Sequence, residues 1–93
     1  MRHPRQIIRF CSPGEGRVHV AKGRTAWALC ELIKAGRVGV TPIDTPGPRW
    51  SAYIFNLRSE YGLDIETVNE PHGGPYPGTH ARYVLKSRIE VVE

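Results

Sequence analysis

The most informative stretch of the chain, residues 48–67, reads PRWSAYIFNLRSEYGLDIET. Its large apolar side chains recur with the spacing of one helical face; they are Trp50, Tyr53, Ile54, Leu57 and Tyr61. Proline suits the first helical position and glycine the position after the last one. The stretch therefore predicts a helix from Pro48 to about Tyr61 that ends before Gly62. Leu63–Val68 then alternates like a half-buried strand.

A second strand is predicted at Arg82–Lys86, where apolar and polar residues again alternate. The segment between the two strands, Asn69–Thr79, contains three glycines and three prolines and is expected to be a loop. The two strands and their loop would form a hairpin within residues 63–88.

The N-terminal part predicts another hairpin within residues 5–21. Gln6–Phe10 is short and rich in branched and aromatic residues, Arg17–Ala21 alternates, and Pro13-Gly14 between them favours a turn. These residues predict two paired strands ahead of the helical region.

Two further helices are expected between the hairpins, within a helical core of residues 24–62. Thr25 can cap a helix over Ala26–Ala35, which Gly36 would end. Thr41-Pro42-Ile43-Asp44 is a helix-start signal, but the prolines that follow restrict this second helix to a stub.

The expected order is hairpin, helix, stub helix, amphipathic helix and C-terminal hairpin. This is an α+β fold, a winged helix-turn-helix with three helices, a two-stranded wing and an N-terminal β-hairpin. Ninety-three residues suit one such domain over 1–93. In this layout the third helix is free to enter the major groove of DNA, and the wing can lie along the phosphates.

Several residues of this region resemble the biotin-repressor type of winged helix; they are Ile54, Leu57-Arg58, Gly62, Ile65 and Tyr83-Val84-Leu85. Longer strings are similar to a family of small winged-helix proteins from bacterial genomes and prophages; they are GRTAWALCELIKAG, TPIDTPGPRWSAY and EPHGGPYPGTHARYVL. The resemblance covers residues 22–88 and implies a transcriptional or phage-type regulator. The stub after Thr41 is shorter than the second helix of the biotin-repressor type, so the turn before the third helix is expected to differ from that type.

The charge distribution agrees with a DNA-facing surface. Residues 1–58 contain ten Lys or Arg and three acids, a net +7, whereas residues 59–93 contain three bases and six acids, a net −3. A basic region beside an acidic one suits a protein that turns one face to phosphates, although an idle basic surface has the same composition.

Candidate DNA-binding residues lie on the outer face of the third helix and on the wing; they are Arg49, Ser51, Ala52, Phe55, Asn56, Arg58, His72, His80 and Arg82. Arg49 could bind guanine and Asn56 adenine, whereas Ala52 and Phe55 could contact thymine methyl groups. Arg58 is expected to contact the DNA backbone or Glu66, and Arg82 a phosphate. Each could instead be a surface residue with a structural partner. Trp27 and Trp50 are expected in the core because of their helical register.

An alternative is a winged helix that serves as a protein-interaction adaptor, with an apolar patch of Tyr53, Phe55 and Tyr76. A third is a small metal-dependent enzyme, but the histidines and cysteines show no zinc spacing. We therefore expect neither catalysis nor a cofactor. No apolar stretch suits a membrane span or a secretion signal, so a cytoplasmic protein is expected. Duplex DNA is the expected partner, and a homodimer or a protein partner would enlarge the small interface of one module.

Overall fold

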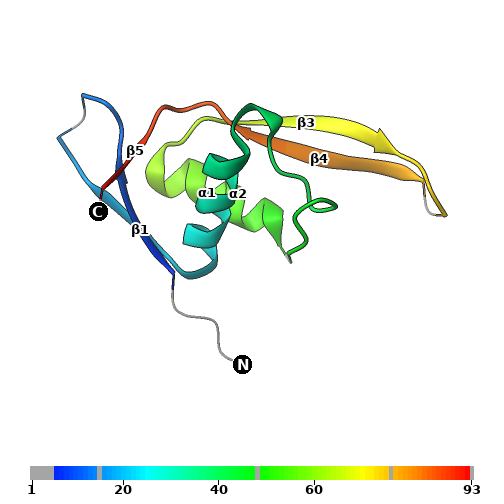
Figure 1. Ribbon diagram of the computed structural model, residues 1–93, viewed down its shortest axis with the longest axis horizontal. Helices are drawn as coiled ribbons and strands as arrows, with labels where there is room; N and C mark the ends of the chain where they lie inside the picture. Colours follow the sequence, from blue (N-terminus) through cyan, green and yellow to red (C-terminus); the bar gives the residue numbers. More distant parts are fainter. Residues whose placement is uncertain (1–5, 15, 48, 76, 93) are drawn as a thin grey trace.

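The computed structural model describes residues 6–14, 16–47, 49–75 and 77–92. In chain order the elements are β1 (Ile7–Cys11), β2 (His19–Lys22), α1 (Gly23–Ala35), the 3-10 turn η1 (Gly36–Val38), α2 (Trp50–Tyr61), β3 (Ile65–His72), β4 (Gly78–Leu85) and β5 (Glu90–Val92). Figure 1 shows the helices in the middle, the sheet containing β1 at one end and the β3–β4 hairpin projecting at the other.

Helix α2 buries the apolar face that the sequence predicts, and α1 packs its own buried side chains into the same core. The buried residues of α2 are Trp50, Tyr53, Ile54 and Leu57, and those of α1 are Ala26, Ala28, Leu29 and Leu32. Trp50 is buried, which confirms its expected core position, whereas Trp27 is only partly buried and packs against the core, with its ring centroid 5.2 Å from that of Trp50. The stacked ring of Tyr83 extends this aromatic cluster to the wing, with centroids 6.3 Å from Trp50.

The N-terminal hairpin belongs to a larger sheet than expected. β1 lies in the centre and pairs antiparallel with β2 on one side and β5 on the other. The strand β5 was not predicted, because three residues are too short to show a period. Alternation along β1 buries Ile8 and Phe10 against the helices and leaves Ile7 and Arg9 outside.

The prediction of three helices is wrong, because the described residues form two α-helices. In place of the stub helix, Thr41 begins a turn in which its Oγ1 accepts from Asp44 N at 2.9 Å and its carbonyl from Thr45 N at 2.9 Å. Thr41 therefore makes the hydrogen bonds expected of a cap, but within a turn and not at a helix, and Trp50 Nε1 donates to Thr45 O where the chain leads on to α2. Pro48, the expected start of the next helix, lies outside the described residues, and α2 begins at Trp50.

Two other boundaries also differ from the predictions. Helix α1 begins at Gly23 after an extended Lys22, so Thr25 lies within it and caps nothing. The wing strands run far into the segment expected to be a loop, and Pro71 pairs with Thr79. Proline is tolerated there because β3 pairs only with β4 and has a free edge.

The segment after η1 joins the wing. Val40 and Tyr83 exchange two backbone hydrogen bonds of 2.8 Å, which adds a one-residue bridge to the free side of β4. The wing is thereby attached to the segment that leaves α1 as well as to α2.

Candidate nucleic-acid interface

The outer face of α2, on the other side of the helix from the buried Trp50, is open to solvent. Ser51, Phe55 and Ser59 follow one another at four-residue spacing on this face, and all three are exposed. Phe55 is 67% exposed, which is unusual for a phenylalanine in the middle of a helix. The face therefore offers small hydroxyl groups on either side of one large apolar ring.

Arg49 stands at the beginning of α2 as its N-cap residue. Its backbone is left-handed, with φ 64°, and its carbonyl accepts the first helical bonds from Ala52 N at 3.0 Å and Tyr53 N at 3.2 Å. The side chain is exposed and has no ion pair within the described ranges. Residues 45–59 contain no acid, so this cation adds to the positive end of the helix dipole.

Ala52 and Asn56 lie one turn apart on a half-buried flank of α2. The structure thus places Arg49, Ser51 and Phe55 fully outward, and it leaves part of Ala52 and Asn56 accessible beside them. All five predicted residues of this part of the helix are therefore at least partly accessible to solvent.

Arg58 has a structural role that the sequence did not reveal. Its Nη2 donates to the carbonyl oxygen of Ile65 and, at 2.8 Å, to Thr67 Oγ1. Its expected contact with Glu66 is not formed, and that carboxylate lies 4.0 Å from Lys86 Nζ. Arg58 therefore connects the last turns of α2 to the first residues of the wing.

The register of the wing assigns its residues to two faces, because opposite residues of an antiparallel pair point to the same side. Thr67 pairs with Tyr83 and therefore faces the helices, as Tyr83 packs on Trp50. Asn69 and Thr79 continue this face toward the tip, and both are exposed. The alternation that identified Leu63–Val68 as a strand would have found them if it had been continued past Asn69.

The opposite face carries the predicted His72, His80 and Arg82; His72 contacts His80, and Glu70 contacts both His80 and Arg82. The Nδ1 atoms of the two histidines are 3.0 Å apart, and His80 Nε2 lies 3.2 Å from Glu70 Oε1. Arg82 Nε donates to Glu70 Oε2 at 2.6 Å, and its Nη1 donates to the carbonyl of Val38 at 2.9 Å. We call these residues the wing cluster: Glu70, His72, His80 and Arg82.

The wing cluster is electrostatically coupled. The hydrogen bond from Arg82 holds the pKa of the Glu70 carboxyl below its usual value, and the same bond raises the pKa of Arg82. The predicted phosphate contact of Arg82 therefore competes with an existing ion pair. The structure separates the predicted site into a helix surface and a wing cluster on the side of the hairpin that faces away from Trp50.

Metal ligation and membrane insertion would need features that the described residues do not provide. Across the described ranges, no three His, Cys, Asp or Glu side chains are grouped so that they could hold a metal ion. Within the same ranges, neither helix has the length and apolar character needed to span a membrane.

A profile match that covers most of the chain decides the family, and the order of elements agrees with it apart from the second helix, which the described residues do not form. Helix α1, the bridging residue Val40, helix α2 and the β3–β4 hairpin follow one another as in winged helix domains, and the sequence profile described as "Winged helix domain" matches residues 18–93. The chain belongs to the winged helix domain family. Winged helices typically bind DNA. Comparison with curated proteins and with solved structures gives no significant match.

Proposed function

We propose that this winged helix protein binds double-stranded DNA through the outer face of α2, as a cytoplasmic transcriptional or phage-type regulator and not as an enzyme. The observation that carries the proposal is the exposed, acid-free start of α2. Arg49, Ser51 and Phe55 point outward there from a helix whose other side is buried in the core.

The chemistry of this surface matches the edges of the bases in the major groove. Arg49 can donate two hydrogen bonds to guanine, Asn56 can bond adenine through its accessible part, and Ser51 can serve a base or a phosphate. The ring of Phe55 can contact a thymine methyl group. Contacts with the DNA backbone would come from basic side chains that have no acidic partner among the described residues, such as Arg49.

The wing contributes a different chemistry from that expected from its sequence. Arg82 is paired with Glu70, so the hairpin offers little free positive charge. Thr67, Asn69 and Thr79 lie on the face nearer to α2 and carry neutral hydrogen-bonding groups. The wing is therefore suited to short-range hydrogen bonds with the sugar-phosphate backbone, while long-range attraction comes from the helical region.

The exposure of Phe55 also favours a second candidate, in which α2 docks on a protein. Of the patch predicted for this function, Tyr53 is buried and Phe55 is exposed, whereas Tyr76 lies outside the described residues. Phe55 alone would then be the centre of the contact. A protein partner would bury its ring, whereas DNA binding depends mainly on the neighbouring cations.

Fluorescence anisotropy with a random-sequence duplex tests the proposal. We expect micromolar affinity at low salt that falls steeply as salt rises, because bound phosphates release counterions. Arg49→Ala should weaken binding and reduce the slope of log K against log salt by about 1 if Arg49 contacts one phosphate. If Arg49 contacts only a base, affinity should fall on selected sequences and the slope should change little.

Lys34→Ala is the matched control, because it removes one positive charge from an exposed residue of α1 that lies 3.5 Å from Glu31. The control should bind like the wild type. Absence of binding at low salt would contradict the proposal. Equal losses in both variants would show that net charge, and not the start of α2, governs binding.

A further inference from the structure

The end of the molecule opposite the wing carries an exposed patch of mixed chemistry. Besides the half-buried Cys11, β1, β2 and β5 turn six exposed side chains away from the helices, which we call the outer sheet patch: Ile7, Arg9, Val20, Lys22, Glu90 and Val92. The aliphatic members are substantially exposed, Ile7 at 53%, Val20 at 40% and Val92 at 36%. Neighbouring exposed aliphatic side chains of this kind mark a contact surface more often than isolated ones do.

Arg9 occupies the centre of the patch. In the register of the sheet it lies between Val20 on β2 and Val92 on β5, so aliphatic side chains flank its stem on both sides. Its guanidinium has no ion pair among the described residues. A cation surrounded by aliphatic groups is stable in an interface only if the other surface supplies an acid.

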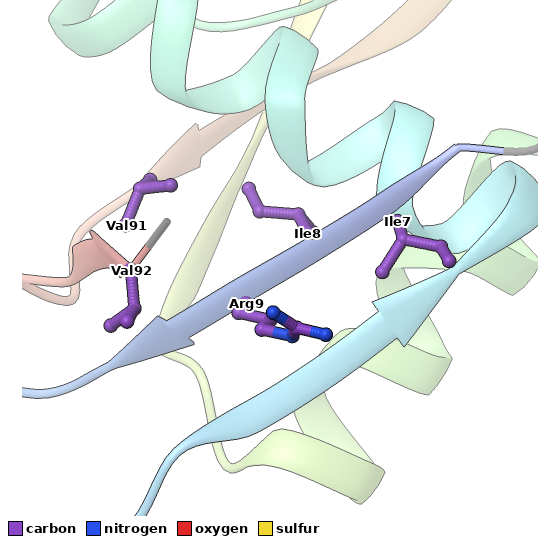
Figure 2. A pocket seen from close by; sticks show the side chains of 5 residues that line it. All are labelled: Ile7, Ile8, Arg9, Val91 and Val92. Carbon is purple, nitrogen blue, oxygen red and sulfur yellow. The ribbon is translucent and has the colours of Figure 1, made fainter.

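The patch itself contains that acid. Glu90 lies on β5 two residues from Val92, on the same outward face, and it is exposed. Figure 2 shows the side chain of Val92 on the same side of the sheet as Arg9, with Val91 pointing the other way. A surface that carries both members of an ion pair and aliphatic groups beside them is complementary to itself.

A surface hollow of about 370 Å³ adjoins the patch. Ile7, Ile8 and Arg9 of β1 line it together with Val91 and Val92 of β5 (Figure 2). An interface that covered the patch would also place an apolar side chain of the opposite surface near this hollow.

We propose that the outer sheet patch is the interface of a homodimer with two-fold symmetry. Such an interface brings the same surface of both copies together, so that Arg9 of each copy pairs with Glu90 of the other. The aliphatic side chains of the two patches pack between the two ion pairs. In each copy the β3–β4 hairpin lies at the end of the molecule away from the outer sheet patch, so the dimer leaves both hairpins uncovered (Figure 1). The inference goes beyond DNA binding and does not depend on it.

Sedimentation velocity of the full chain without DNA tests the dimer, over concentrations from about 1 μM to about 1 mM, which span moderate to weak affinities. We expect a monomer–dimer equilibrium in the wild type. Arg9→Glu and Glu90→Arg should each weaken the dimer at least about tenfold, because each places like charges opposite one another. The double variant Arg9→Glu/Glu90→Arg should restore the dimer, because it exchanges the partners of both ion pairs.

Arg37→Glu is the control, because it reverses the charge of an exposed arginine outside the sheet. Val92→Ser tests the aliphatic part independently and should also weaken the dimer. Circular dichroism of each variant verifies the fold. A chain that stays monomeric at all concentrations overturns the proposal, and so does a dimer that the single charge reversals leave unchanged. Neither result bears on DNA binding, since no DNA is present.

Discussion

Val40 and Tyr83 form a two-way backbone pair, in which each amide donates to the other carbonyl at 2.8 Å. The pair attaches β4 to the segment that follows η1, and the ring of Tyr83 stacks on Trp50 of α2. One residue of the wing thus contacts both segments that flank the turn at Thr41. The Val40–Tyr83 pair and the hydrogen bonds that Arg58 donates to β3 together fix the position of the wing relative to α2.

Gly39 should be indispensable for the Val40–Tyr83 pair. Its φ is 79°, and a Cβ there would lie 2.7 Å from the Tyr83 carbonyl oxygen and 2.8 Å from Val84 Cγ2. We expect Gly39→Ala to lower the free energy of unfolding by about 2 to 4 kcal/mol, because it adds backbone strain to a steric clash. Urea denaturation measures the change.

Gly73→Ala is the comparison, because no atom lies within 4 Å of a Cβ at that position and its φ is not in the left-handed region. It should change stability by no more than about 1 kcal/mol. Equal stability of the two variants would show that the approach of β4 to residue 39 is not as close as the structure has it.

Truncation to alanine should lower the stability of the fold much more at Leu57 than at Phe55, although both are apolar residues of α2. Leu57 is fully buried, so Leu57→Ala should destabilise the fold by about 2 to 5 kcal/mol through lost burial and a cavity. Phe55→Ala should change stability by no more than about 0.5 kcal/mol, because its ring is mostly in solvent. Thermal unfolding compares them, and a large loss in Phe55→Ala would mean that the ring packs on the protein.

Arg58→Ala should loosen the start of the wing without unfolding the core. It removes the hydrogen bonds to the Ile65 carbonyl and to Thr67 Oγ1, which together should contribute about 1 to 2 kcal/mol. Hydrogen exchange should accelerate at the amides of β3 relative to those of α1. Arg37→Ala removes an exposed arginine elsewhere and should leave exchange in β3 unchanged; similar acceleration in both variants would exclude a specific role of Arg58.

The wing cluster should make stability depend on pH in the acid range. Because Arg82 lowers the pKa of Glu70 below its usual value of 4.5, the carboxylate stabilises the folded state at neutral pH. This contribution is complete above pH 4.5 and is lost as pH falls through the lower pKa of the folded state.

Glu70→Gln should therefore lose less stability than the wild type between pH 7 and about pH 3.5, as measured by urea denaturation at several pH values. Glu66→Gln is the control, because Glu66 and Lys86 are both exposed and form only a weak ion pair, with 4.0 Å between Oε1 and Nζ. Its pH profile should match that of the wild type. An identical pH profile for wild type and Glu70→Gln would mean that the Glu70–Arg82 bond does not persist in solution.

Local patterns predicted the long elements well. The period of Trp50, Tyr53, Ile54 and Leu57 gave the buried face of α2 correctly, because a helix of 12 residues repeats its pattern over three turns. The pattern did not predict β5, which has only three residues, or the extension of the wing past Asn69. Glycine and proline indicated a loop there, but cross-strand hydrogen bonds outweighed local preference.

The candidate site was predictable on the helix and only partly on the wing. Exposure of Arg49, Ser51 and Phe55 follows from helical geometry, since these residues lie opposite the apolar face. The partners of Arg58 and Arg82 could not be predicted, because both side chains reach residues of other elements. From its charge alone, an arginine is expected to bind phosphate. In the folded chain Arg58 instead donates to the Ile65 carbonyl, and Arg82 donates to the Glu70 carboxylate.

Residue types and their spacing were therefore sufficient for the family, for the buried face of α2 and for the outward position of Arg49 and Phe55. These features depend on short-range order that is repeated along the chain. Only the packed chain decided that Thr41 starts a turn, that β5 joins β1 and that the wing histidines face away from Trp50. The physical reason is that such features depend on contacts between residues far apart in the sequence, and side-chain partners and strand register exist only after the elements have packed.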